Sequence, residues 1–365
     1  MKPGFYLPIL KSKLGEFTAL SKLDNFTKNH IAPLFEVTPL EWDQVERKKP
    51  RTLDEHLKSF CNKLKNKWPS DNCFIDTHLL KWEGTDNTTK IDFIFDKLSE
   101  CQIAPIPVVR VTSSTQFIRT INSIKNNLPV VEIAFRVTPN DVTSPEFGEH
   151  LDTLLKYIHI EPSQVHLIFD LIDSNFSSVE EITESILGIL EVFPFWADWK
   201  SFTIAGTAFP SSSSIKEGTF KFNRNEWRSY KSLVKRLQKE SFSRSVNYGD
   251  YSIVNPEYFE FNPKIMKASA NIRYTHNDLW VVAKGKALKK AIDYLQYKKL
   301  SKEIYNSGLF LGERFSQGDL HLAKCVRDEE GPGAPSTWNW VGHNHHFTKV
   351  VSDLFANQTL ILSIL

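Results

Sequence analysis

Charged side chains stand inside or just after several short apolar runs of this sequence. Lys11, Glu36, Asp76, His78, Arg110, Glu132, Arg136 and Asp170 belong to the first six runs, and Asp250 and Tyr251 open a later one. Charges within apolar segments are costly to bury unless they are paired or face a solvated pocket. We therefore expect these side chains to converge on one pocket of mixed charge.

Three chemistries fit this set of residues. The carboxylates that could act together are Glu36, Asp76, Glu132 and Asp170. They could hold a divalent cation such as Mg²⁺, while Lys11 and Arg110 neutralise a phosphoryl group in the transition state. Two of them could instead serve as acid and base on a glycoside, and Lys11 could form a Schiff base. The combination of bases and carboxylates favours phosphoester or nucleotide chemistry, with Arg136, Asp250 and Tyr251 as ligand-binding residues.

The same charges could also pair with one another and merely close the fold. Glu36 with Lys11 and Glu132 with Arg110 are the ion pairs to expect in that case. The set holds more bases and carboxylates than such closure needs, which favours a functional pocket.

The apolar runs that carry these residues alternate with longer segments of helical period. The eight candidate strands are 5–11, 32–37, 73–78, 107–112, 130–137, 165–172, 201–209 and 251–256. Three of the helices between them have start signals of capping-box spacing, namely Thr52 with Glu55, Ser113 with Gln116 and Ser177 with Glu180. This alternation predicts an α/β fold, a (β/α)8 TIM-like barrel over residues 1–260, with a doubly wound open sheet as the alternative. In either fold, ligands bind at the carboxyl ends of the strands.

The pattern changes after residue 260, where we expect a C-terminal α+β extension, 261–365, packed on the barrel rim. It begins with a hairpin that turns at Asn277 and Asp278, followed by a lysine-rich helix over 286–300. Further on, His343 and His346 are three residues apart, a spacing that could place two metal ligands on one helix face. With Trp338 just upstream, we expect this segment to line the barrel mouth and to contribute His345 or His346 to the pocket.

Composition excludes several classes of protein. The 365 residues carry a net charge of +2 and are 41% hydrophobic, which indicates an ordinary globular chain. So small a net charge gives no overall electrostatic attraction to nucleic acid. Nucleic acid stays open as a ligand of a local patch. The four cysteines form no CxxC pair, and we see neither a signal peptide nor a membrane span, so we expect a cytoplasmic protein. The GxGxxG, P-loop and GxSxG motifs are absent.

Five segments in series resemble the beta protein family. They are YLPILKSKLGEFTAL, HIAPLFEVTP, NYGDYSIVNPEY, IRYTHNDLWVVAKG and PSTWNWVGHNHHFTKVV, and the similarity runs from the first residues to about residue 350. One position departs from the family's pattern, because Asn339 stands where the family has Arg. The resemblance implies a protein carried by phages and by bacterial mobile or defence-associated loci. It also implies functional roles for Lys11, Glu36, Asp250, Tyr251, Tyr274, His345 and His346.

Two functions follow as hypotheses. The first is a metal-assisted phosphoester or nucleotide hydrolase in the conflict between phage and host, with a phosphorylated small molecule as its ligand. The second is a non-catalytic recognition protein that binds a phage, host or operon-encoded protein through the barrel mouth and the segment with Trp338 and His345.

Overall fold

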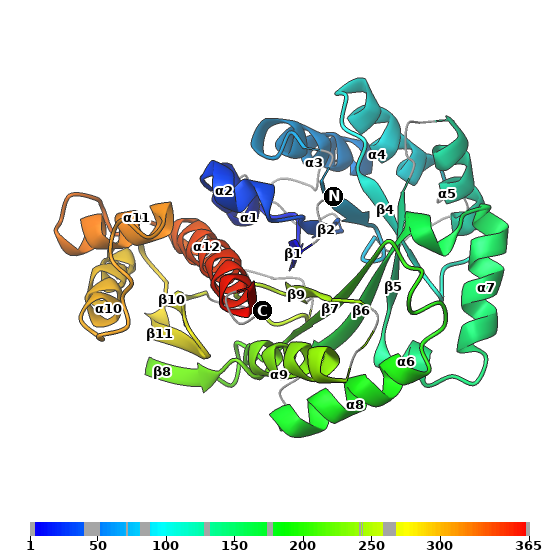
Figure 1. Cartoon of the computed structure of the whole chain (residues 1–365). Helices are drawn as coiled ribbons and strands as arrows, with labels where there is room; N and C mark the ends of the chain where they lie inside the picture. Colours follow the sequence, from blue (N-terminus) through cyan, green and yellow to red (C-terminus); the bar gives the residue numbers. More distant parts are fainter. Residues whose placement is uncertain are drawn as a thin grey trace.

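A closed barrel of eight parallel strands forms the centre of the molecule (Figure 1). The structure, a computed structural model, describes residues 4–39, 52–70, 72–80, 88–127, 132–173, 178–240, 242, 244–257 and 268–362. The barrel strands are β1 (Tyr6–Leu10), β2 (Leu34–Glu36), β3 (Phe74–Asp76), β4 (Ile106–Arg110), β5 (Ile133–Val137), β6 (Val165–Asp173), β7 (Ser201–Thr207) and β9 (Asn247–Asp250). They pair in this order, and β9 closes the ring against β1. The predicted (β/α)8 barrel is therefore confirmed, and the open sheet was the wrong alternative.

The eighth barrel strand lies just before the segment expected from the sequence. β9 ends at Asp250, and the predicted strand 251–256 follows it as turn and bend. Gly249 fits between the neighbouring strands, since an added Cβ would lie 3.0 Å from the Leu7 carbonyl oxygen. The Asp250 carboxylate then accepts a hydrogen bond from the Ser252 backbone N–H at 2.8 Å, and Ser252 has a φ of 54°. This local bond competes with strand pairing and ends β9.

Helices surround the barrel and begin close to the predicted positions. They are α1 (Leu14–Ser21), α2 (Asn25–Asn29), α3 (Leu53–Lys67), α4 (Thr88–Glu100), α5 (Thr115–Asn127), α6 (Pro139–Val142), α7 (Phe147–Ile158), α8 (Val179–Glu191) and α9 (Asn225–Lys239), with a 3-10 turn, η1 (Pro162–Gln164). The capping box of Thr52 with Glu55 is confirmed. The other two N-caps are one residue later than expected, at Ser114 and Ser178. No helix in the described ranges has both the length and the apolar character to cross a bilayer.

The C-terminal elements form a second layer beside the barrel. They are β10 (Ser269–His276), β11 (Leu279–Ala287), η2 (Ala291–Leu295), α10 (Gln296–Tyr305), α11 (Gln317–Val326) and α12 (Pro335–Leu362). The predicted hairpin is confirmed, with Asn277 at a φ of 47° in its turn. The helix expected over 286–300 was placed too early. The Asp293 carboxylate accepts hydrogen bonds from the backbone N–H groups of Lys289 and Lys290, which caps a 3-10 turn, and α10 follows that turn.

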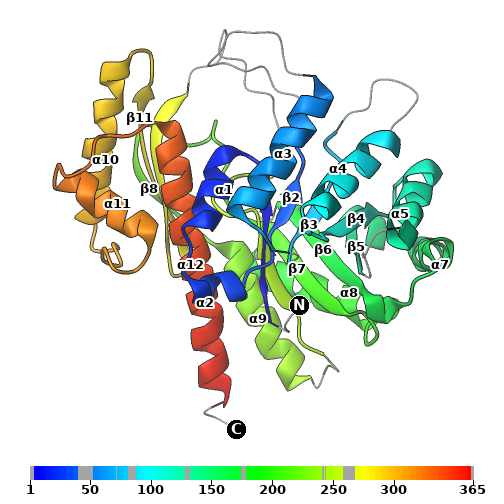
Figure 2. The same ribbon diagram turned by 90° about the horizontal axis from the view of Figure 1, so that it is seen from above.

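Two elements lie across the expected boundary at residue 260. A strand from before it, β8 (Gly218–Asn223), pairs with β11 and completes a three-stranded sheet. After the boundary, α12 packs on α1 and contacts β1 (Figures 1 and 2). Phe347, Val350 and Val351 of α12 are buried in the same apolar cluster as the outward face of the barrel. The last helix thus covers the barrel wall itself.

Alternation along the strands separates two sets of side chains. On β5, Ile133, Phe135 and Val137 point outward under the helices, whereas Ala134 and Arg136 point into the barrel. Inward residues of the other strands fill the barrel interior with Leu7, Ile9, Leu34, Phe74, Val108 and Ile168. Along each strand, the inward-pointing side chains form a column that ends in a polar residue at the carboxyl edge of the barrel. The two-residue alternation of a strand therefore brings those polar residues together.

The contact between α11 and α12 provides a test of the packing. A Cβ added at Gly318 would lie 2.4 Å from the carbonyl oxygen of Val341, whereas one added at Gly331 meets nothing within 4 Å. Alanine in a helix is intrinsically favoured over glycine by about 1 kcal/mol. We nevertheless expect Gly318→Ala to lower the free energy of unfolding by about 2 kcal/mol. The new methyl group would clash with the backbone of α12, which cannot move aside as a flexible side chain can. Urea denaturation should show this loss in Gly318→Ala and not in the control Gly331→Ala; equal stability of the two would contradict the packing.

Candidate functional site

The barrel mouth holds a cluster of charged side chains, which we call the rim cluster. It consists of Lys11, Glu36, Asp76, His78, Arg110, Arg136, Asp170 and Tyr251. Lys11 follows β1, Glu36, Asp76 and Arg110 each end a strand, and Arg136 and Asp170 lie near the ends of β5 and β6. The register aligns Glu36 with Asp76 and Arg110 with Arg136. These predicted residues are therefore brought together as expected.

The guanidinium of Arg136 lies at the centre of the rim cluster, and only 2% of this residue is exposed. Its Nη1 donates to Glu36 Oε1 and to Asp76 Oδ2, both at 2.8 Å. Its Nε and Nη2 donate to Asp170 Oδ2 at 2.9 and 2.6 Å. Nη2 also donates to the Tyr251 hydroxyl at 2.8 Å, and that hydroxyl donates to Asp170 at 2.7 Å. One cation thus holds carboxylates from three strands.

Three basic groups form the outer edge of the cluster. Lys11 donates to Glu36, as expected for the closing ion pair, and to the Pro256 carbonyl at 3.2 Å. Arg110 donates to Asp76 at 3.1 Å, and its Nε is buried without a hydrogen-bond partner. His78 Nδ1 lies 3.0 Å from Asp76 Oδ1. The side chains of Arg110 and His78 are 23% and 27% exposed, so a ligand in the mouth would meet these groups first.

The cluster keeps the carboxylates of Glu36 and Asp76 ionised. Burial acts to raise the pKa of Glu36, but the charges of Arg136 and Lys11 outweigh burial and lower it. Burial likewise opposes ionisation of Asp76, yet hydrogen bonding to His78 and the charges of Arg110 and Arg136 hold its pKa well below the usual range. Burial raises the pKa of the Tyr251 hydroxyl well above its ordinary value, so this group stays protonated. Glu36 and Asp76 are therefore unsuited to act as a general acid.

Glu36, Asp76 and His78 could together hold a metal ion. Each offers one ligand atom, and these atoms lie within 4.8 Å of one another. Two ionised carboxylates and an imidazole are ligands that divalent cations accept. The Arg136 guanidinium already contacts both carboxylates, so an ion would have to bind on the side where His78 faces them.

Glu132 lies at the other end of the barrel, so its expected place on the rim was wrong. It precedes β5, pairs with Lys200, and lies 2.8 Å from Nε2 of His166, whose Nδ1 is 2.7 Å from Ser201. Glu132 has the same strand parity as Arg136 but stands at the amino edge, four residues earlier. The predicted pair of Glu132 with Arg110 was also wrong, since Arg110 contacts Asp76.

Asp250 faces away from the mouth. It is one residue from Tyr251, and alternation turns its side chain outward, between the barrel and α12. There it accepts hydrogen bonds from the hydroxyls of Tyr6 and Tyr248 and lies 2.9 Å from Nε2 of His346. Burial opposes ionisation of Asp250, but His346 and these hydrogen bonds lower its pKa. Asp250 is thus placed to hold α12 on the barrel.

The expectation that the segment His343–His346 lines the barrel mouth was wrong. The segment joins the barrel to the C-terminal extension. His343 lies 2.8 Å from the Ser252 hydroxyl, and Asn344 donates to the Ala19 carbonyl of α1 at 3.0 Å. His345 contacts Asp319 and the Thr275 carbonyl, both at 2.7 Å, and His346 contacts Asp250 and the Thr275 hydroxyl. These four side chains are buried and already bonded within the protein, so the spacing of His343 and His346 does not create a metal site.

Tyr274 and Trp338 belong to the core of the extension. Tyr274 donates to Asp319 at 2.8 Å and stacks on His345, with ring centroids 3.8 Å apart. Trp338 stacks on Tyr297 and is 2% exposed. Asp319, which was not among the residues expected from the sequence, joins Tyr274 to His345. Ser316 caps α11 by accepting from the Asp319 backbone N–H, and only the fold reveals that Asp319 also contacts His345.

A family model described as Beta protein matches residues 6–352. The chain belongs to the beta protein family. The match includes the barrel, the sheet of β8, β10 and β11, and most of α12, and it confirms the resemblance of the five sequence segments. No curated protein matches the chain.

One of the solved structures that resemble this chain in part is an enzyme. It is a GH128 (subgroup I) endo-beta-1,3-glucanase from Amycolatopsis mediterranei in complex with laminaritriose. The two chains are 12% identical, the similarity covers 57% of this chain and 90% of the glucanase chain, and the TM-score is 0.30.

Replacing the central cation tests the rim cluster. We expect Arg136→Met to lower the free energy of unfolding by about 3–5 kcal/mol, because three buried carboxylates lose their shared partner. Arg236→Met is the control, since Arg236 pairs at the surface with Glu184 and Glu240 and its loss should leave the free energy of unfolding nearly unchanged. Urea denaturation at pH 7 measures both.

The same variant should change the pH dependence. The native pKa values of Glu36 and Asp76 are lowered, so their stabilisation is full above the unfolded values of about 4 and is lost as the pH falls through the native values. Without Arg136 this loss between pH 5 and pH 3 should become smaller. Parallel stability curves for the native protein and Arg136→Met would contradict this account.

His343 predicts a second pH effect. Burial, followed by the charges of Arg273 and His346, lowers its pKa to about 3. The unfolded chain takes up this proton near pH 6.5 and the folded chain does not, so stability should fall by about 1.4 kcal/mol per pH unit below that value. His343→Asn should lower the slope between pH 7.5 and 5 by this amount and leave the share of the other buried imidazoles whose pKa is lowered, and the variant of the exposed His150, His150→Asn, should keep the native slope. An unchanged slope in denaturation midpoints of His343→Asn would refute the assignment.

Proposed function

We propose that this beta protein binds a phosphorylated small molecule or nucleotide at the barrel mouth and hydrolyses its phosphoester with the help of a divalent cation. The observation that carries the proposal is the outer edge of the rim cluster, where partly exposed Arg110 and His78 and the ammonium of Lys11 lie beside ionised carboxylates. Action in the conflict between phage and host is the setting that the family resemblance suggests, and we propose the cytoplasm as its compartment.

The residues divide into two roles in this proposal. Arg110 and Lys11 would bind phosphoryl oxygens and offset the negative charge of the transition state, as guanidinium and ammonium groups do. Among the described residues, the buried Nε of Arg110 has no hydrogen-bond acceptor, so this guanidinium carries an unused donor beside the mouth. Glu36, Asp76 and His78 would hold the cation, whose chemistry is Lewis-acid polarisation of a phosphoryl oxygen and activation of water.

The remaining members would position these groups. Arg136 fixes the orientation of Glu36 and Asp76 through its Nη1, and Tyr251 holds Asp170 on the other side of the guanidinium. Such second contacts restrict the rotation of ligating carboxylates, which favours a preformed site.

A recognition protein is the second candidate, favoured by a specific observation. Arg136 already engages a carboxylate from each of three strands, so the cluster is largely self-compensated. A protein partner would then contact the exposed edge of the mouth. Trp338 and His345 cannot form that contact surface, because both side chains are buried.

Thermal unfolding of the purified protein distinguishes the two candidates. The panel consists of nucleotides and phosphosugars, each with and without Mg²⁺, Mn²⁺ or Zn²⁺. A ligand present at 100 times its dissociation constant stabilises by about 2.7 kcal/mol. For the hydrolase we expect a shift that needs both metal and phosphate and release of phosphate or alcohol product in the same mixtures.

Substitutions assign that shift to the mouth. Asp76→Asn should abolish it, and Asp152→Asn, at an exposed ion pair with Lys156, should leave it intact. Metal-dependent stabilisation that persists in Asp76→Asn, or no metal-dependent stabilisation by any member of the panel, would reject the hydrolase and favour the recognition protein.

A further inference from the structure

Two large aliphatic side chains face solvent on η2, just before α10. Ile292 is 65% exposed and Leu295 is 49% exposed. A 3-10 turn has three residues per turn, so side chains three positions apart lie one above the other. Ile292 and Leu295 are therefore on the same outer side of η2, where they form a small apolar patch.

The opposite side of α10 is anchored in the protein. Tyr297, Leu300 and Ile304 are buried against the sheet of β10 and β11. The other face of that sheet, with Trp280 and Val282, packs toward the barrel. Figures 1 and 2 show α10 at the edge of the molecule, with the sheet between it and the barrel. The apolar patch thus points outward from a well-packed support.

Exposed lysines surround the apolar patch. Lys289 and Lys290 directly precede η2, and Lys299 and Lys302 follow Leu295 at the spacing of one helix side. Leu295, Lys299 and Lys302 line a common hollow of about 570 Å³. We use the name η2–α10 surface for the side chains of Lys289, Lys290, Ile292, Leu295, Lys299 and Lys302.

The carboxylates near this surface do not neutralise it. Residues 289–303 include two of them, Asp293 and Glu303. Asp293 caps η2 by accepting from two backbone N–H groups, at 2.7 and 2.9 Å. Glu303 lies 4.0 Å from Lys299, and the other three lysines of the surface make no ion pair with any residue that the structure describes. Four lysines against two carboxylates leave the surface positively charged.

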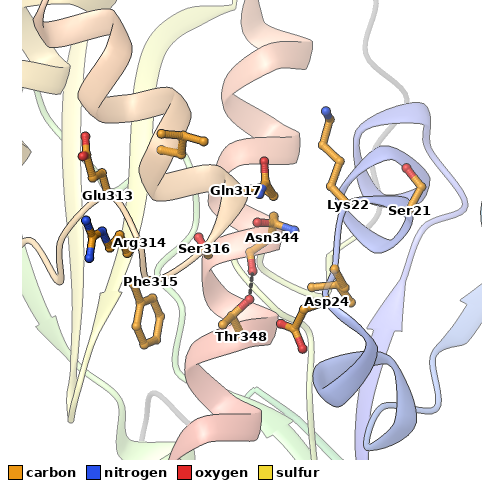
Figure 3. A pocket seen from close by; sticks show the side chains of 12 residues that line it. Ser21, Lys22, Asp24, Glu313, Arg314, Phe315, Ser316, Gln317, Asn344 and Thr348 are labelled. Atoms are coloured by element: carbon orange, nitrogen blue, oxygen red, sulfur yellow. Dashed lines mark hydrogen bonds between the residues drawn. The ribbon is translucent and has the colours of Figure 1, made fainter.

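A cavity elsewhere in the molecule lacks this one-sided charge. Figure 3 shows the cavity of about 620 Å³ between α1, α11 and α12, in which Lys22 and Arg314 lie on opposite sides. Asp24 and Glu313 also line it, so its cationic and anionic side chains are equal in number. The η2–α10 surface is therefore the better match for an anionic partner.

We propose that the η2–α10 surface binds the face of an anionic lipid bilayer. Lysines grouped on an amphipathic helix attract anionic head groups. Ile292 and Leu295 enter the boundary between the head groups and the acyl chains. Nucleic acid fits less well, since single strands bind through aromatic side chains that stack on bases, and the patch is aliphatic. The contact stays on the membrane surface, needs no spanning helix and is independent of the barrel mouth.

Co-sedimentation with lipid vesicles tests this proposal. The protein should bind vesicles made of phosphatidylglycerol and phosphatidylcholine in equal parts. It should bind vesicles of phosphatidylcholine alone at least about tenfold more weakly, because the lysines then lose their anionic partners. Added salt should weaken the binding to the anionic vesicles. Equal binding to both vesicles, or binding to neither, would overturn the proposal.

Two double variants of equal charge change locate the basic contact. Lys289→Glu with Lys290→Glu should weaken binding to the anionic vesicles by about tenfold or more, and Lys235→Glu with Lys239→Glu, at exposed positions of α9, by less than about threefold. Equal losses in the two variants would overturn the assignment to this surface. Binding of a single-stranded oligonucleotide that is lost in the first variant, without binding to anionic vesicles, would assign the surface to nucleic acid instead.

A pair of single variants tests the apolar contact. Ile292→Ser should weaken binding to the anionic vesicles by about threefold or more, because one aliphatic side chain no longer enters the bilayer. Val192→Ser is the control, since Val192 is 80% exposed at the end of α8, outside this surface. Unchanged binding in Ile292→Ser would contradict insertion. All of these side chains are exposed, so circular dichroism spectra and melting temperatures of the variants should match those of the native protein.

Discussion

The guanidinium of Arg136 sets the arrangement of the barrel mouth. Its donors contact carboxylates that belong to β2, β3 and β6, strands that are far apart in the sequence. Each of these carboxylates would be costly to bury alone, and the guanidinium would be equally costly without them. The cluster therefore forms only when the strands are in register, which makes it a specific constraint on closure of the barrel. It also fixes where ionised oxygens stand at the mouth.

A second polar network joins the barrel to the C-terminal elements. Four consecutive residues of α12, His343 to His346, contact the segment after β9, α1, α11 and β10. Their directions differ because successive helix residues are about 100° apart, so the contacts encircle the helix. An apolar helix could cover the barrel as well. It would not, however, fix both the rotation of the helix about its axis and its position along that axis. The buried polar contacts specify a single position for α12 between two layers of structure.

The sequence predicts much of the mouth because strand period determines it. Once the strands are placed, Leu7, Ile9 and Lys11 share a column, as do Ala134 and Arg136, so the rim residues follow from alternation and from strand ends. The same rule would have corrected two assignments. Glu132 shares the parity of Arg136 but stands before β5, at the amino edge, and Asp250 has the parity of the outward Tyr248. Both errors came from strand boundaries displaced by a few residues, at which sequence patterns are least informative.

The contacts of α12 could not be predicted in the same way. The spacing of His343 and His346 is compatible with a metal pair, and only the fold shows that Ser252, Thr275 and Asp250 already use these imidazoles. No local pattern encodes partners that lie 70 or more residues away. The sequence pattern likewise placed β8 with the barrel half of the chain, since pairing with β11 depends on a hairpin that follows some 50 residues later.

The compensation of charge at the mouth limits which ligands can bind there. A cation that approaches Glu36 and Asp76 competes with Arg136, whose burial and short contacts oppose its displacement, so the free side of these carboxylates near His78 is the position left to it. An anion meets the opposite situation, because the Nε of Arg110 has no acceptor within the part of the chain that the structure describes. Binding of an anion alone would add negative charge beside three carboxylates, whereas a metal and a phosphate together restore the balance. This mutual dependence favours ligands that carry their own divalent cation, as nucleotides commonly do.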